Sequence, residues 1–225
     1  MIVNKTATIQ IVKPSDVPVL LIDNFYEDPQ EVRAQALKAT YDHSLGQYPG
    51  RHASIDPSSI GTVLDVLSQI LNRVGDRHFR AEDFTSDFSI ITTRPDELLV
   101  TQKHPHIDPT PVIGVLYLTP NSDEGTSLYR NEYIGTAVVQ TPEHHRKHSE
   151  FMNIFGESAS PNGYLVEDDA MWKKIYTIEP IFNRLAIYPG NAFHSVDIKR
   201  VAARINMDTV RVTQRFIIKN CFEKA

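Results

Sequence analysis

Apolar residues in the first third of the chain repeat with helical spacing, whereas those further on repeat with the spacing of strands. One run has an apolar side chain at every third or fourth position: Ile60, Leu64, Leu67, Leu71 and Val74. This spacing predicts an amphipathic helix that begins after Asp56-Pro57 and ends at Gly75. A shorter helix is predicted after Asp28, which can cap it, with Pro29 at the first helical position. We expect both helices to follow a strand over 17–22 and to pack on the outer face of a sheet.

Short runs rich in β-branched and aromatic residues dominate from residue 84 onward, and Pro, Gly and Asn separate them. Such runs are typical of strands, and they cover residues 84–93, 98–102, 111–118, 184–188 and 210–219. Helices followed by many short strands favour a mainly β sandwich or barrel with helices packed against it.

The stretch 131–179 interrupts this series of strands. Its polar segment 143–148 holds three histidines, at positions 144, 145 and 148, among Glu, Arg and Lys residues. We interpret this segment as a solvated helix rather than a second metal site. A short helix is also predicted over 167–176. An insertion of this size between strands is often a lid or a binding loop.

Composition narrows the class of protein. The chain has 225 residues, a formal net charge of -5 and no block of five like charges, which argues against nucleic acid as the main partner. No run of 18 apolar residues or secretory signal is visible, so we predict no membrane span. The one cysteine, Cys221, cannot form an internal disulfide, and a reducing cytoplasm is the predicted location. Nothing in the composition indicates an oligomeric state.

The candidate chemistry begins with His106 and Asp108, which precede the strand predicted over 111–118. In an extended chain, residues two apart point to the same side, so an imidazole and a carboxylate can be presented together. The third candidate ligand is His194, 88 residues after His106 and just after a strand and a Pro-Gly turn. Two histidines and one carboxylate are the ligand set of non-haem Fe(II) oxygenases. The His-x-Asp pattern alone is common by chance, and it is the framing strands that favour a metal site over a turn or surface role.

Open positions on such a metal can accept a 2-oxo acid, whose far carboxylate needs a fixed cation. Arg211 and Thr213 share one face of the last predicted strand, 17 residues after His194, so guanidinium and hydroxyl can bind one carboxylate. Arg204, 10 residues after His194, is the rival in a less strand-like context. A salt bridge at the mouth of the barrel is the structural alternative for Arg211.

The order of these motifs resembles the Fe(II)/2-oxoglutarate-dependent dioxygenase superfamily. More closely, it resembles the DUF6445-type members, which are related to the prolyl-4-hydroxylase-like group. The matching segments are 21–25 with Asp28-Pro29, then 106–108, 115–118, 125–130, 183–191, 193–195 and 211–214. Each motif is loose, but their shared order is fairly specific and spans residues 20 to 218. The stretch 131–179 matches no part of the family pattern.

The resemblance implies a double-stranded β-helix (a jelly-roll, cupin-like core), with Fe(II), 2-oxoglutarate as co-substrate and O2 as oxidant. It implies that His106, Asp108 and His194 bind the iron and act in catalysis, and that Arg211 and Thr213 bind the co-substrate. The predicted layout is one oxygenase domain over 1–225. Residues 1–83 supply the first strand and buttressing helices, and 84–220 supply the jelly-roll core.

Three further residues are candidates for contacts in the site. Tyr117 is a candidate for binding the co-substrate, and Tyr129 for binding the substrate, although core packing is the more common role of such aromatic residues. Arg130 is a candidate for binding a substrate carboxylate, with a surface salt bridge as the equal alternative. His104 is interpreted as a loop residue that Pro105 holds, or else as a supporting partner of the metal ligands.

The predicted function is therefore hydroxylation of an amino acid, a peptide or a related small molecule, with release of succinate and CO2. The carboxylate of Asp108 favours this outcome, because halogenases of the superfamily replace it with a small residue. Desaturation or cyclisation begins with the same hydrogen abstraction and is left open. The alternative from another class is a non-catalytic, cupin-like protein that binds a metal or a ligand, and Arg211 discriminates between the two because a metal site alone needs no carboxylate-binding cation.

Overall fold

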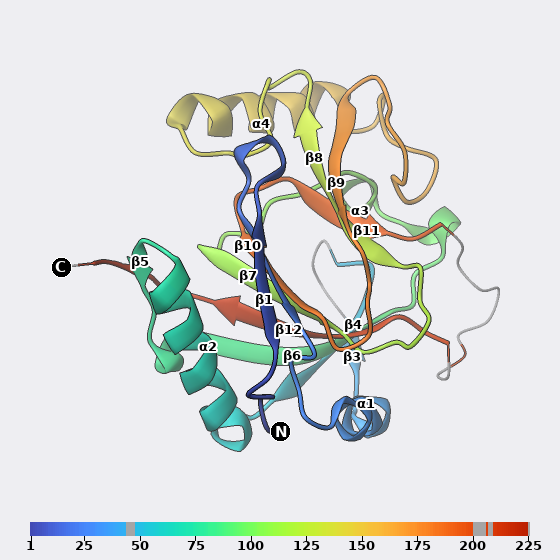
Figure 1. Cartoon of the computed structure of the whole chain (residues 1–225). Helices are drawn as coiled ribbons and strands as arrows, with labels where there is room; N and C mark the ends of the chain where they lie inside the picture. Colours follow the sequence, from blue (N-terminus) through green and yellow to red (C-terminus); the bar gives the residue numbers. More distant parts are fainter. Residues whose placement is uncertain (44–47, 200–205, 207–208, 225) are drawn as a thin grey trace.

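Two antiparallel β-sheets form the centre of the molecule (Figure 1). The computed structural model describes residues 1–43, 48–199, 206 and 209–224. The larger sheet has the order β1-β2-β10-β7-β12-β6-β4-β3, and its strands are β1 (Thr8–Val12), β2 (Val19–Asp23), β3 (Asp42–His43), β4 (Gly50–Ile55), β6 (Phe84–Ile91), β7 (Val112–Tyr117), β10 (Leu185–Pro189) and β12 (Val212–Ile218). The smaller sheet has the order β11-β8-β9 and consists of β8 (Gly125–Asn131), β9 (Trp172–Ile178) and β11 (His194–Asp197). A separate pair joins β5 (Arg77–His78) to β13 (Phe222–Glu223).

Helices α1 (Pro29–Lys38) and α2 (Gly61–Val74) occupy the stretches in which the sequence predicts helices. The Asp28 side chain accepts a hydrogen bond from the Glu31 backbone N–H and so caps α1 as expected. The apolar faces of both helices pack against the larger sheet, where Leu67 of α2 and Phe216 of β12 belong to one buried cluster. Both helices therefore lie on the sheet face that is away from the smaller sheet (Figure 1).

Strand β12 has one face toward the helices α1 and α2 and the other toward the space between the two sheets. It lies between β7 and β6 in the larger sheet and pairs with both. Val212, Phe216 and Ile218 point into the cluster under α1 and α2. Because side chains alternate along a strand, Thr213 and Arg215 face the opposite way and line a cavity between the two sheets.

The strands predicted over 17–22, 84–93, 111–118, 184–188 and 210–219 are confirmed by β2, β6, β7, β10 and β12. The strand predicted over 98–102 is wrong, because a 3-10 turn at Pro95–Glu97 leads into the short helix α3 (Val100–Lys103). The Gln102 side chain accepts a hydrogen bond from the Leu99 N–H at the start of this helix. A side-chain cap of this kind stabilises a helical turn that composition alone does not predict.

The short helix predicted over 167–176 is also wrong. These residues lead into β9, which pairs with β8. The Asp169 side chain accepts hydrogen bonds from the backbone N–H groups of Met171 and Trp172 and forms the turn before the strand. The β-branched residues Ile175 and Thr177 then favour extended backbone.

The solvated helix expected around residues 143–148 is confirmed as α4 (Pro142–Phe155). On its exposed face Arg146 forms ion pairs with Glu143 and Glu150. Its buried residue Phe151 packs edge-on against Trp172 of β9. The helix is therefore attached to the smaller sheet through an aromatic cluster, and no helix of the described residues is long and apolar enough to span a membrane.

Leu67 provides a test of the buttress, because its side chain is fully buried between α2 and the sheet. We expect Leu67→Ala to lower the free energy of unfolding by about 2–5 kcal/mol, through lost apolar burial and the cavity left behind. Urea denaturation followed by circular dichroism measures this change. The matched control is Gln69→Ala on the exposed face of the same helix, which should change stability by roughly 0.5 kcal/mol or less. Equal effects of the two substitutions would contradict the packing described here.

Candidate metal centre

His106, Asp108 and His194 lie together at one end of the smaller sheet. The backbone N–H of His106 donates to the carbonyl of His194, and the reverse bond is also formed, each at 2.9 Å. This isolated antiparallel bridge joins two segments that are 88 residues apart. The backbone N–H of Asp108 donates to the carbonyl of Gly190 at 2.7 Å. Backbone pairing thus fixes the position of all three side chains before any ligand binds.

The three side chains offer a compact set of donor atoms. One ligand atom from each lies within 4.8 Å of the others, and His194 Nε2 is 3.4 Å from Asp108 Oδ2. His194 Nδ1 lies 2.9 Å from the carbonyl oxygen of Ala192. Since a carbonyl can only accept, that contact places a proton on Nδ1, and Nε2, which faces Asp108, is the nitrogen that can act as a ligand when it carries no proton.

The surroundings of His106 and Asp108 keep both side chains in the protonation states that bind a metal. Burial, together with the charge of neighbouring His194, lowers the pKa of His106 to about 3. Burial alone would raise the pKa of Asp108, but the hydrogen bond and charge of His194 outweigh it and lower that pKa to about 2. At neutral pH the site therefore presents a neutral imidazole and a carboxylate, and no proton has to leave either group when a cation binds.

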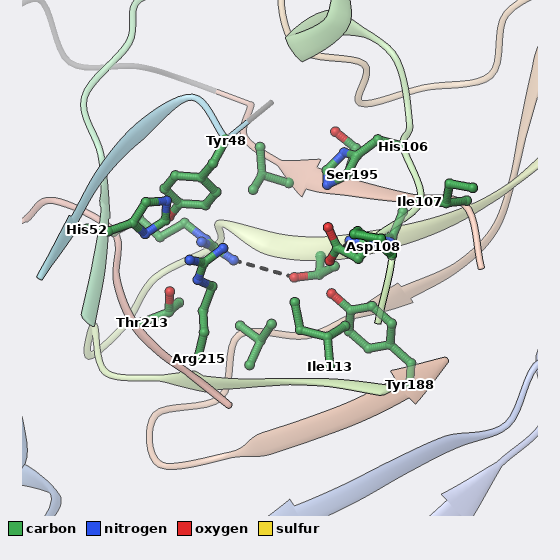
Figure 2. Close-up of a pocket in the computed structure, with 16 residues that line it drawn as sticks. Tyr48, His52, His106, Ile107, Asp108, Ile113, Tyr188, Ser195, Thr213 and Arg215 are labelled. Atoms are coloured by element: carbon green, nitrogen blue, oxygen red, sulfur yellow. Dashed lines mark hydrogen bonds and ion pairs between the residues drawn. The ribbon is translucent and has the colours of Figure 1, made fainter. Parts of the chain in front are cut away.

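The triad opens into a cavity of about 480 Å³ between the two sheets. Figure 2 shows that His106 and Asp108 lie on one side of this cavity, while Arg215 reaches in from β12. Apolar side chains, including Ile113 and Val115 of β7, line much of the remaining wall. A pocket with apolar walls and a few convergent polar groups is typical of small-molecule sites.

Arg211 lies at the start of β12 and is buried, with 3% of its surface exposed. Its Nε donates to the carbonyl of Glu124 at 2.9 Å, and Nη2 approaches the carbonyl of Gly125 and the Thr126 hydroxyl at 3.3 and 3.4 Å. Among the residues the structure describes, it forms no ion pair with a carboxylate. Its charge is therefore held by neutral oxygens alone at the wall of the cavity.

Thr213 shares the cavity with Arg211, and its buried hydroxyl oxygen has no hydrogen-bond partner among the described residues. Tyr117 is fully buried behind this wall, and its hydroxyl donates to Thr126 at 2.8 Å. The Arg211 guanidinium carbon lies 5.7 Å from the centre of the Tyr117 ring. The structure thus brings together the three residues predicted to bind the co-substrate, whereas Arg204 lies outside the described residues.

The two residues predicted to bind substrate lie elsewhere. Tyr129 is buried, and its hydroxyl donates to the carbonyl of Leu165 within the aromatic cluster of the smaller sheet. Arg130 is exposed and pairs with Glu132 at 3.3 Å. Neither residue lines the cavity that holds the triad, so a contact with substrate stays a prediction from the sequence alone.

His104 and the stretch 131–179 have structural partners. His104 is buried, with Nε2 at 2.8 Å from the carbonyl of Gly156 and Nδ1 accepting from Trp172 Nε1 at 3.2 Å. His104 therefore connects α4 and β9 to the segment that carries the metal ligands. The predicted role of 131–179 as a lid stays a prediction.

Sequence reasoning gave no site role to several polar residues of the cavity wall, among them Tyr48, His52 and Arg215. Arg215 carries a signal that could have found it, because it lies two residues beyond Thr213 on the same face of β12. Tyr48 and His52 belong to a stretch without a clear strand pattern, and β4 was not predicted.

Comparison with known proteins gives a family and a fold. The sequence profile of a family of unknown function, DUF6445, matches residues 4–216. A prolyl hydroxylase from Trichoplax adhaerens, solved in complex with a hypoxia-inducible-factor peptide fragment, superposes with a TM-score of 0.50 at 14% identity, over 91% of this chain and 83% of that one. A prolyl-4-hydroxylase from Pseudomonas putida gives a TM-score of 0.49 at 15% identity, over 92% and 93%. No curated protein matches the chain significantly in sequence. The likeness to the Trichoplax structure confirms the predicted double-stranded β-helix.

The triad makes a direct prediction for metal affinity. We expect His106→Ala and His194→Ala each to raise the dissociation constant for Co(II), a stable stand-in for Fe(II), by roughly 100-fold or more. Loss of a partner that merely supports a metal ligand costs about 10–100-fold, and loss of the ligand itself should cost no less. Isothermal titration calorimetry with metal-free protein measures the constant. His78→Ala, on the exposed strand β5, serves as the matched control and should bind as the parent protein does. Retention of tight binding by both triad variants would refute the site.

Proposed function

The chain belongs to the DUF6445 family, and from that membership, the fold and the site we propose that it is a non-haem, Fe(II)- and 2-oxoglutarate-dependent oxygenase. We propose hydroxylation of an amino acid, a peptide or a related small molecule as its reaction. One observation carries the proposal: a His-Asp-His triad and a buried arginine without a carboxylate partner among the described residues line the same cavity.

The donor set fits Fe(II). Two imidazoles and one carboxylate leave half of an octahedral coordination sphere for co-substrate and O2. All three ligands line the cavity, so the remaining positions can face the space where other molecules bind. A closed structural zinc site, by contrast, uses four protein ligands, and the cluster found among the described residues has three.

The opposite wall fits the distal carboxylate of a 2-oxo acid. A buried guanidinium that only neutral oxygens contact has an unbalanced charge, which a carboxylate would neutralise. The Thr213 hydroxyl is buried beside it without a partner and can donate to the same carboxylate. Both groups project from one face of β12, so their spacing is set by the strand rather than by a flexible loop.

When bound, Fe(II) and 2-oxoglutarate would supply the oxidising chemistry, in which 2-oxoglutarate, O2 and a substrate C–H group yield succinate, CO2 and a C–OH group. The chain's own residues provide position and environment. His194 is oriented by its Nδ1 contact with Ala192, and Asp108 keeps a charged carboxylate toward the metal position. Ile113 and Val115 exclude water from part of the cavity, which limits loss of reactive species to solvent.

The alternative is a cupin-like protein that binds a metal or a ligand without oxidising anything. It accounts for the triad equally well. It does not account for a buried guanidinium and an unpartnered hydroxyl on the same cavity, because a metal site alone needs no carboxylate-binding cation. Arg211 therefore discriminates between the two functions.

The test is anaerobic addition of Fe(II) and then 2-oxoglutarate to metal-free protein, followed by visible spectroscopy. We expect the weak charge-transfer band of an iron-bound 2-oxo acid. We expect Arg211→Met to raise the dissociation constant for 2-oxoglutarate by about 10–100-fold, because a charge-assisted hydrogen bond contributes about 1.5–3 kcal/mol.

Arg130→Met is the matched control, since this arginine is exposed and paired with Glu132, and it should leave the band and the affinity unchanged. Fe(II) binding without any band would contradict the oxygenase and favour the metal-binding protein. An unchanged affinity in Arg211→Met would remove Arg211 from the co-substrate site.

A further inference from the structure

We propose that Arg215 and Tyr48 form a second carboxylate-binding subsite in the cavity, and that it binds the substrate rather than 2-oxoglutarate. The inference rests on the proposed oxygenase function and names its substrate class: an organic acid whose carboxylate lies within a few bonds of the carbon that is oxidised. Both residues line the cavity that holds the triad (Figure 2).

Arg215 is held in a fixed orientation by Asp87. Its Nε donates to Oδ1 at 2.9 Å and its Nη2 donates to Oδ2 at 2.6 Å, which is the two-pronged geometry that orients a guanidinium most firmly. The third nitrogen, Nη1, has no partner among the described residues. The side chain keeps 19% of its surface accessible, and it lines the cavity, so part of the guanidinium stays available to a ligand.

Asp87 is itself fixed from behind. Its Oδ1 accepts from the Ser89 hydroxyl at 3.0 Å, and His52 Nδ1 lies 3.6 Å away. Burial alone would raise the pKa of Asp87, but its contacts with His52 and Arg215 lower it. The carboxylate therefore stays charged, and the guanidinium cannot rotate away without leaving that charge unpaired.

Tyr48 supplies a second donor beside Arg215, and the charges of both Arg211 and Arg215 act on its hydroxyl. Its ring centre lies 5.3 Å from the guanidinium carbon. Its hydroxyl is buried and forms no well-aligned hydrogen bond with any described residue, although the Ser89 hydroxyl is nearby. Burial raises the pKa of Tyr48, so the phenol keeps its proton at neutral pH. A protonated phenol next to a guanidinium offers two kinds of donor to one carboxylate.

Arg215 can bind a carboxylate although Asp87 already balances its charge. The two-pronged pair with Asp87 neutralises the guanidinium from behind the wall. The remaining nitrogen, Nη1, therefore offers an oriented hydrogen-bond donor rather than an excess charge. Selection of a carboxylate at this position then depends on the geometry of the donors.

The position of Arg215 favours substrate over co-substrate. Arg211 and Arg215 are four residues apart on β12, so their Cα atoms are about 13 Å apart along the strand. Arg215 pairs with Val115 of β7, and the next inward-facing residue of β7, Ile113, pairs with Tyr188. The Tyr188 ring lies 5.0 Å from the ring of His194. Arg215 is thus the arginine nearer the triad along the strands, whereas Arg211 contacts Glu124, Gly125 and Thr126 at the other end of the strand.

A pair of probes that differ in one group tests the subsite: N-acetylglycine, which has a carboxylate, and N-acetylglycinamide, which has an uncharged amide in its place. The protein is loaded with Mn(II) and 2-oxoglutarate, and relaxation enhancement of the acetyl methyl protons reports binding near the metal. In the parent protein we expect at least a tenfold larger enhancement for N-acetylglycine than for the amide.

Two variants remove the subsite in different ways. Arg215→Met combined with Asp87→Asn removes both charges of the buried pair, so no unpaired charge is left to unfold the protein. Tyr48→Phe removes one hydroxyl only. We expect the first to reduce the enhancement by N-acetylglycine to the level of the amide, and the second to reduce it several-fold. Arg184→Met is the matched control, because Arg184 binds Asp23 through the same two nitrogens away from the cavity, and it should behave as the parent does.

The outcomes separate the proposals. In the Arg215 and Tyr48 variants, the dissociation constant for 2-oxoglutarate should stay within threefold of that of the parent protein. A rise of more than tenfold in this constant would assign Arg215 to the co-substrate and overturn the inference. Equal enhancement by both probes in the parent protein, or no loss in either variant, would also overturn it. If Mn(II) or 2-oxoglutarate does not bind the parent protein, the oxygenase proposal itself fails, and this is seen before either probe is added.

Discussion

The alternation of side chains along β12 is the constraint on which the rest of the structure depends. Val212, Phe216 and Ile218 anchor the strand to the core beneath α1 and α2. The residues between them, Thr213 and Arg215, face the cavity. A shift in register by one residue would place charged groups in that core and apolar groups in the site. Pairing with strands on both sides prevents such a shift, so the packing of the helices also fixes the chemistry of the opposite face.

The metal ligands depend on a different kind of pairing. His106 and His194 come from segments far apart in the sequence, and one isolated backbone bridge joins them. Their rings, with centres 4.4 Å apart, are brought close in a buried place where a second positive charge is unfavourable. Burial is the main reason why the pKa of His106 falls, and the neighbouring His194 lowers it further. A cation that binds between them would find its ligands already gathered by the fold.

How much of this could be predicted from the sequence depended on local signals. The helix over 61–74 and the strand over 112–117 were predictable, because apolar spacing decided both. The helix α3 and the strand β9 were not, because side-chain caps at Gln102 and Asp169 set those backbones. The triad was predictable because strands frame both His106-x-Asp108 and His194, whereas the His-x-Asp pattern alone is common by chance. Arg215 was missed because its role depends on Asp87, a partner 128 residues away that only the β6–β12 pairing brings near.

The two arginines of β12 show how similar residues on one strand face can serve different ends. Arg211 is buried against neutral oxygens, so its charge is costly unless an anion joins it. Arg215 is already paired with Asp87, so its charge costs less, and its remaining donors are oriented before any ligand arrives. Arg211 can therefore contribute affinity for an obligatory charged partner, whereas Arg215 is better suited to selecting among partners by geometry. Under the proposed function, the first arrangement suits a co-substrate that binds in every turnover and the second suits discrimination among substrates, and one strand face carries both into the same cavity.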